Sequence, residues 1–200
     1  MKPLNRTISL ALSLLLVGAA AHSNTVEELT KEQRITEFAK MPVAERQKPE
    51  FFAMKLVAKY SAERVDTESD RSKIKLEENE EIVVLNHMTN GKPSKELLIV
   101  EKNSRLNRTH ILECGTFRGQ RGWDLFIKFT EDGKKLLAET TKEADGGRMA
   151  IILGGSLVLT APRIVEPISS GSVIISGNLT QSEAEAVAAF FENPKPTTAK

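Results

Sequence analysis

Hydrophobic and polar positions alternate most regularly within Asp124–Thr130. Leu125, Ile127 and Phe129 share one face of this segment, and the residues between them are mostly polar. A period of two is typical of a β-strand that is buried on one side only. The next segment, Gly133–Thr141, places its leucines and threonines at helical spacing, which predicts a helix lying on the sheet.

A β-hairpin is predicted further along the chain. Two short apolar runs, Met149–Leu153 and Leu157–Thr160, flank the break Gly154–Gly155–Ser156. Aliphatic and β-branched runs on either side of a glycine-rich break favour two antiparallel strands. Ala161–Pro162 ends the second strand, because proline has no N–H group for the ladder.

A third strand and a helix follow this hairpin. Val173–Ile175 is the strand candidate, and Gly177–Asn178 predicts a turn after it. Thr180 is followed three residues later by Glu183. This spacing is a capping box, in which each side chain satisfies a backbone donor at the start of a helix.

Earlier strands are predicted at Ile82–Leu85 and Leu97–Val100, with a turn at Asn90–Gly91 between them. The basic stretch Asn103–Gly122 predicts a short helix or a loop. Before these strands, residues 64–81 are mostly charged and have no apolar period, which indicates a solvated linker and a domain boundary.

The N-terminal part predicts two helices. The first is polar and occupies residues 24–42, where a proline ends it. The second begins at Pro49, and Phe52, Leu56 and Tyr60 form an apolar stripe along it. Such a stripe is typical of a face packed on the core, and the alternative is a docking face for a partner.

Several short motifs from this pattern occur together in one known family. They are Phe-Thr-Glu-Asp-Gly at 129–133, Met-Ala-Ile-Ile-Leu at 149–153, Thr-Ala-Pro at 160–162, Glu-Pro-Ile-Ser-Ser-Gly at 166–171 and Ile-Ser-Gly-Asn-Leu-Thr-x-x-Glu-Ala at 175–184. In this order they resemble the head subdomain of the first periplasmic region of SecD/SecDF, the membrane subunit that assists protein export through the Sec translocon. The likeness covers roughly residues 97–191. The chain departs from the family at Gly154–Gly155–Ser156, where the family usually has Asp-Gly.

The resemblance implies an α+β fold, mainly an antiparallel sheet with helices on one face, preceded here by the helical N-terminal segment. It also implies a role in handling unfolded exported chains, with no catalytic, cofactor-binding or metal-binding residue. The residues that carry the family motifs are therefore expected to be structural. They are Phe129, Gly133, Thr140, Ala150, Ala161, Pro162, Pro167, Gly171, Ser176, Gly177, Asn178 and Thr180.

The first residues predict export. Lys2 and Arg6 precede an apolar stretch that ends in small residues at Ala19–Ala21, the pattern of a cleavable signal peptide. Cleavage after Ala21 or Ser23 would release a periplasmic or secreted protein, and an uncleaved segment would anchor it. Without Lys2 and Arg6 the chain has one more acidic than basic residue, which argues against nucleic-acid binding.

Candidate chemistry is sparse. Cys114 is the only cysteine, so no internal disulfide forms, and with His110 it supplies two ligands where a zinc site needs more. A hydrolase would use Ser156 as nucleophile or the pair Glu143 and Asp145 as acid and base. However, a nucleophile elbow joins a strand to a helix, and Ser156 lies between two strands.

These patterns predict a non-enzymatic exported binding module without a cofactor. Its expected segments are a signal peptide (1–21), a helical segment (22–63), the charged linker (64–81), the head-like domain (82–192) and a disordered tail (193–200). Its expected partner is unfolded or extended polypeptide, bound along a sheet edge, or an envelope or Sec-type membrane protein, and not nucleic acid or a small-molecule cofactor. The alternatives are a structural docking subunit of an envelope complex and, less favoured, a hydrolase.

Overall fold

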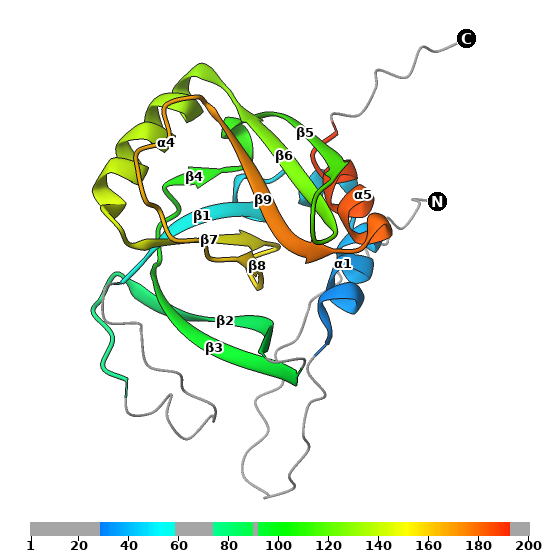
Figure 1. Cartoon of the computed structure of the whole chain (residues 1–200), viewed down its shortest axis with the longest axis horizontal. Helices are drawn as coiled ribbons and strands as arrows, with labels where there is room; N and C mark the ends of the chain where they lie inside the picture. Colours follow the sequence, from blue (N-terminus) through cyan, green and yellow to red (C-terminus); the bar gives the residue numbers. More distant parts are fainter. Residues whose placement is uncertain (1–28, 59–73, 90–91, 193–200) are drawn as a thin grey trace, which may run out of the picture.

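The computed structural model describes residues 29–58, 74–89 and 92–192, which form two antiparallel sheets with helices around them (Figure 1). The predicted α+β class is confirmed, with two sheets in place of one. The predicted signal peptide, most of the charged linker, the Asn90–Gly91 turn and the 193–200 tail lie outside the described residues.

The larger sheet has the strand order β2–β3–β1–β7–β8, and a short strand, β4, pairs with β1. The strands predicted at residues 82–85 and 97–100 are confirmed as parts of β2 and β3, and the hairpin around Gly154–Gly155–Ser156 is confirmed as β7 and β8. The bounds are β1 Phe52–Val57, β2 Glu80–Thr89, β3 Lys92–Glu101, β4 Leu106–Asn107, β7 Arg148–Leu153 and β8 Leu157–Thr160.

The second predicted helix is wrong, because a single 3-10 turn, η1 (Pro49–Phe51), leads directly into strand β1. This strand lies between β3 and β7 at the centre of the sheet. Phe52 faces one hydrophobic cluster, while Ala53 and Val57 face another on the opposite side. Residues four apart, such as Phe52 and Leu56, share a face in a strand as well as in a helix, so their spacing did not separate the two structures.

The smaller sheet contains β5 (Ile111–Arg118), β6 (Trp123–Phe129) and β9 (Ser172–Leu179), in that order. Leu125, Ile127 and Phe129 are buried, which confirms the half-buried strand. The prediction of a short helix or loop before it holds for η2 (Arg108–His110) and for the loops at 103–105 and 119–122, but it is wrong for β5, which occupies the eight residues after η2.

The predicted turn at Gly177–Asn178 is also wrong, because β9 continues through it to Leu179. Trp123 pairs with Leu179 and the adjacent Asp124 pairs with Ser176, so the register shifts by two residues within β9. Gly177 and Asn178 are the residues that this shift leaves without a partner position. The sequence signal that predicted a turn therefore marks a bulge in the strand.

Helix α1 (Lys31–Lys40) is followed by the single turn α2 (Val43–Arg46). The predicted helix after β6 is confirmed as α4 (Glu131–Ala144), and that after β9 as α5 (Gln181–Ala189). The capping box of α5 is present: the Thr180 N–H donates to Glu183 Oε2 at 2.7 Å, and the Glu183 N–H donates to Thr180 Oγ1 at 3.3 Å. Helix α5 packs on the smaller sheet and against α1, as Figure 1 shows at the right of the molecule.

Two hydrophobic clusters hold these layers together. The first lies between the two sheets and includes side chains of α1, α4 and α5, such as Ile35, Leu137 and Val187. The second lies on the other face of the larger sheet, where Val83 and Leu98 of the β2–β3 hairpin pack over β1, β7 and β8. The larger sheet therefore curls until β2 approaches β8, although these two strands do not pair.

Candidate functional site

Most of the family-motif residues are placed where they build the fold. Phe129, Thr140, Ala150 and Ala161 are buried. Thr180 caps α5. Burial limits side-chain size at the first four positions, and Thr180 supplies a cap.

Other motif residues direct the backbone. A β-carbon on Gly133 would lie 2.8 Å from the His110 carbonyl oxygen, so glycine lets α4 begin against η2. Gly171 has a φ of +76°, and its carbonyl accepts from the Phe129 N–H at 2.9 Å. The Pro162 carbonyl accepts from the Met149 N–H at 3.1 Å, while Pro167 is exposed.

The residues considered for hydrolysis are engaged elsewhere or stand apart. Ser156 is exposed in the β7–β8 turn, where its N–H donates to the Leu153 carbonyl at 3.1 Å. Asp145 forms the C-cap of α4 with a left-handed backbone. Glu143 is bound to Arg105 by two hydrogen bonds of 3.0 Å.

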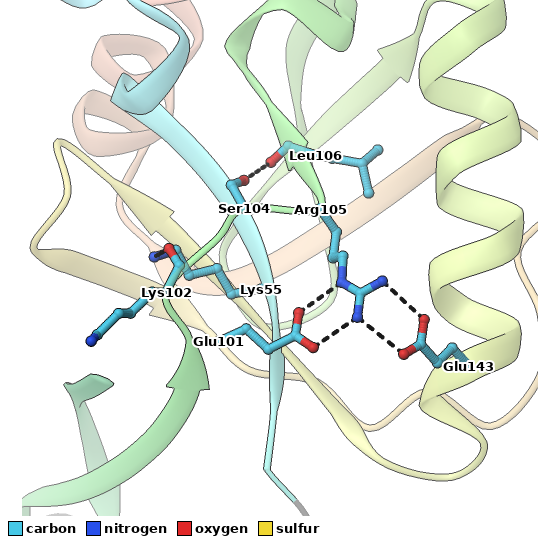
Figure 2. A network of polar contacts seen from close by, with 7 residues as sticks. All are labelled: Lys55, Glu101, Lys102, Ser104, Arg105, Leu106 and Glu143. Carbon is cyan, nitrogen blue, oxygen red and sulfur yellow. Dashed lines mark hydrogen bonds and ion pairs between the residues drawn. The ribbon is translucent and has the colours of Figure 1, made fainter. Parts of the chain in front are cut away.

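That arginine is the centre of a polar network at the surface (Figure 2). Its guanidinium also donates two hydrogen bonds of 2.7 Å to Glu101, at the end of β3. Arg105 therefore links the end of the larger sheet to α4 through two bidentate contacts, and the hydrogen bond to Glu101 is the main cause that raises its pKa. Beside it, the Lys55 ammonium donates to the Lys102 carbonyl at 2.5 Å. This network joins β1, β3 and α4 through the loop that carries Arg105.

Cys114 and His110 do not form a metal site. His110 lies in η2, and its Nδ1 accepts from the Asn107 N–H at 3.1 Å. Cys114 lies in β5, and burial raises the pKa of its thiol to about 12. Within residues 29–58, 74–89 and 92–192, no three His, Cys, Asp or Glu side chains converge in a way that would hold a metal ion.

Arg108 is a buried cation that sequence reasoning did not identify. Its side chain donates to the Phe191 carbonyl at 2.9 Å, and its guanidinium lies 5.3 Å from the centre of the Phe191 ring. Burial lowers the pKa of this guanidinium. The contact fixes η2 to the chain just beyond α5, which complements the negative end of that helix.

The free edge of β9 is the first feature with binding potential. Among the residues that the structure describes, this strand pairs with β6 alone, and it carries no charged residue or proline from Ser172 to Leu179. Natural proteins usually protect an exposed strand edge with such residues. On the outer face of the sheet, Gly115, Phe126 and Ile174 occupy neighbouring positions on the three strands, and the Ile174 side chain is 62% exposed. The edge therefore adjoins an apolar row in which Ile174 is exposed and Phe126 is half-buried.

A pocket of about 880 Å³ is the second feature, and it lies near the C-terminal part of β9. Its walls come from the start of α1, the ends of β2 and β3 nearest their connection, the end of β8, and Ser176 of β9. Among the described lining residues are Lys31 and Lys95 but no aspartate or glutamate. His87 also lines it, and its Nδ1 is buried without a hydrogen-bond partner in the described part of the chain.

Sequence reasoning predicted the strand that contains Ile174 but not the pocket. Its lining residues are distant in sequence, and the one signal was His87, two residues after the apolar run Ile82–Leu85. The described helices also include none that is long and apolar enough to cross a bilayer.

A family model described as "SecDF, P1 head subdomain" matches residues 82–193. The protein translocase subunit SecD of Acidaminococcus fermentans is 45% identical over 67 residues, which are 34% of this chain and 16% of that protein. The SecD of Rickettsia typhi is 33% identical over 92 residues, or 46% of this chain and 18% of that protein. The chain thus spans less than a fifth of the length of these relatives.

A solved structure of SecDF, described as a membrane component that enhances protein export, overlays on 83% of this chain and 70% of its own, with a TM-score of 0.49 and 17% identity. A second SecDF structure, in a super-membrane-facing form, covers 72% of this chain with a TM-score of 0.47.

Proposed function

The chain belongs to the SecDF P1 head family, and we propose that it is a non-enzymatic accessory to protein export that binds extended polypeptide along the free edge of β9. The observation that carries this proposal is the edge itself, which has no strand partner in the described part of the chain, is uncharged and adjoins the exposed Ile174. An extended chain would add to the smaller sheet as a fourth strand beside β9.

Strand addition suits a partner whose sequence varies. The incoming chain makes hydrogen bonds through its backbone, which every polypeptide has, and its side chains contact the apolar row of Phe126 and Ile174. Ordering a flexible chain offsets much of this contact energy, so binding is weak and tolerant of sequence. Salt dependence is modest, because the exported chain has almost no net charge.

We place this function outside the cytoplasm, because residues 1–21 have the pattern of a signal peptide. Cleavage would give a new N-terminus at His22 or Asn24, which intact-mass measurement of the exported protein would identify. Recovery of the full-length chain only in membrane pellets would contradict cleavage.

The direct test is titration of unfolded, signal-less secretory proteins against the purified protein, with a folded protein as control. Ile174→Lys adds a charge to the edge and should abolish binding. Val165→Lys is the matched control, since Val165 is 87% exposed in the β8–β9 connection. Ile174→Pro should act like Ile174→Lys, and circular dichroism must show that each variant is folded. If no unfolded chain binds the wild-type protein, the proposal fails.

The alternative, a docking subunit that uses its N-terminal helices, has less support. The apolar face of α1 is already packed within the chain: Ile35 is buried, and the Phe38 ring contacts the rings of Phe51 and Phe190. A pulldown from the cell envelope that captures one stoichiometric partner, together with no binding of unfolded chains, would favour this alternative.

A further inference from the structure

The edge of β9 that does not face β6 presents the backbone groups of every second residue. The Phe129 N–H donates to the Gly171 carbonyl at 2.9 Å, which makes these two residues a hydrogen-bonded pair of β6 and β9. Because such pairs alternate along an antiparallel ladder, the recorded register also directs the N–H and C=O groups of Val173 and Ile175 toward β6. The corresponding groups of Ile174 therefore point to the free edge.

The backbone groups of Ser172 and Ser176 point the same way as those of Ile174. The Ser172 N–H donates to the Ser170 hydroxyl at 3.4 Å, and this exposed hydroxyl donates to the Ser172 carbonyl at 3.1 Å. For Ile174 and Ser176, the described part of the chain supplies no hydrogen-bond partner on that side. The edge can therefore pair at its centre, and one exposed side chain covers one end of it.

The strand segment on this edge is self-complementary. From residue 172 to residue 176 it reads Ser-Val-Ile-Ile-Ser. When a second copy of the segment runs antiparallel with Ile174 opposite Ile174, serine meets serine and Val173 meets Ile175. A shift by two residues sets serine opposite isoleucine, and a shift by one residue exchanges the two faces of the strand. A single register therefore matches every position.

The neighbouring strand β6 supports the same arrangement. On the outer face of the smaller sheet, each residue of the edge has one neighbour on β6: Lys128 beside Ser172, Phe126 beside Ile174 and Asp124 beside Ser176. In the antiparallel register, the Phe126 and Ile174 side chains of both copies form one apolar row. Lys128 of each copy then faces Asp124 of the other across two serines, and these charges attract. A parallel pairing would instead set lysine against lysine.

We propose that two copies of this chain pair their β9 strands antiparallel about a two-fold axis at Ile174, joining the two three-stranded sheets into one. Each copy contributes the same groups to this interface, so the association stops at a dimer. The interface is one strand edge and one apolar row, which is less than a standard interface, so it is weak and reversible. Self-pairing also covers the edge proposed to bind polypeptide and competes with that binding. This competition alone rests on the proposed function.

Sedimentation equilibrium of the purified protein tests the association. The protein should be monomeric at about 10 µM and partly dimeric at about 1 mM. Ile174→Lys places two ammonium groups at the two-fold axis and should keep the protein monomeric at both concentrations. Val165→Lys makes the same charge change in the exposed β8–β9 connection and should leave the dimer intact. A wild-type protein that stays monomeric at the higher concentration, or equal dimerisation of the two variants, would overturn the proposal.

Cysteine cross-linking tests the register, in a Cys114→Ala background so that each variant has a single thiol. Opposite residues of a hydrogen-bonded antiparallel pair have Cα atoms about 5.5 Å apart, within the reach of a disulfide. Ile174→Cys should therefore oxidise to a dimer about tenfold faster than Ser172→Cys, whose two copies would lie roughly 13 Å apart. A mixture of Ser172→Cys and Ser176→Cys should recover the fast rate in mixed dimers. Equal rates in all samples would contradict the register.

A short extended peptide from a signal-less secretory protein separates this inference from the proposed function. At the higher protein concentration, a saturating amount of the peptide should convert the dimer into a peptide-bound monomer. If the peptide binds and the dimer persists, the two do not share the β9 edge and the proposed competition is wrong. If no peptide binds but Ile174→Cys cross-links as described, the proposed function fails and the self-pairing stands.

Discussion

Gly154 and Phe38 pack so closely that no β-carbon fits between them. A β-carbon on Gly154 would lie 2.4 Å from Cε1 and Cζ of the Phe38 ring. This glycine is part of the Gly-Gly-Ser turn that differs from the family pattern, and Phe38 belongs to α1, which precedes the residues matched by the family model. The unusual turn therefore accommodates the N-terminal helix.

The first prediction follows from this contact. Gly154→Ala should destabilise the fold by about 2–4 kcal/mol, through a left-handed backbone with a φ of +55° and through the clash with Phe38. Gly155→Ala is the matched control, because its φ is +69° but nothing lies within 4 Å of the added β-carbon. It should cost only about 1–2 kcal/mol.

Urea denaturation of both variants gives the measurement. In a Phe38→Ala background, the cost of Gly154→Ala should fall to that of Gly155→Ala, because the clash has been removed. An unchanged cost in that background would contradict the packing explanation.

The second prediction concerns the domain boundary. The sequence predicts that residues 82–192 fold without the first sixty. The position of β1 favours the opposite result, since β3 and β7 would lose the strand that lies between them. A chain that begins at residue 82 should show broad, non-cooperative unfolding. A chain that begins at residue 29 should unfold cooperatively. Cooperative unfolding of the shorter chain would support the domain boundary predicted from the sequence at residues 64–81.

The third prediction concerns Cys114 and pH. Burial is the main cause that raises the pKa of its thiol from 9.0 to about 12; the nearby Glu113 adds to this shift and Arg108 opposes it. The unfolded chain thus loses the thiol proton near pH 9, while the folded protein keeps it until near pH 12. The contribution of this proton to stability is complete below pH 9 and is lost as the pH rises from 9 to 12.

Stability curves of the wild-type protein and Cys114→Ala over pH 8–11 should therefore converge as the pH rises. At pH 8 the native thiol should react with a disulfide reagent far more slowly than the thiol of the urea-unfolded chain. Fast reaction in the native state would contradict the burial of the sulfur.

The fourth prediction concerns Arg105. Its side chain is 36% exposed and Glu143 is 54% exposed, so solvent weakens their attraction. Glu143→Gln should cost less than about 1 kcal/mol of unfolding free energy, and the cost should shrink in high salt. Glu139→Gln, exposed on the same helix, is the control and should have no effect. A loss above 2 kcal/mol would show that the network contributes more than its exposure indicates.

The elements that could be predicted from the sequence have one buried face or an explicit terminal signal. Leu125 and Ile127 alternate with exposed positions, so β6 was predictable, and Thr180 with Glu183 marked the start of α5. Strand β1 was missed because both of its faces are buried, which removes the alternation. Strand β5 was missed because several of its side chains are polar and its apolar Leu112 and Phe117 point to solvent.

The candidate site, too, could be predicted from the sequence only in part. The sequence indicated the strand β9 through the β-branched run around Ile174, and only the structure shows that this strand lies at the edge of the smaller sheet. The pocket depends on β2, β8, β9 and α1 meeting at one place, and only the tertiary structure brings His87 near Ser176.

The pairing of β1 with β7 also sets the order in which the chain can fold. Phe52 pairs with Leu153, so one edge of the central strand stays unpaired until a partner about a hundred residues later in the chain has been synthesised. At a synthesis rate of about 5–20 residues per second, this delay is roughly 5–20 s. During that time β1 has an unpaired, hydrophobic edge, and closing so long a loop is slow. The protein that we propose as a binder of unfolded chains thus cannot complete its own larger sheet until the chain has been made beyond Leu153.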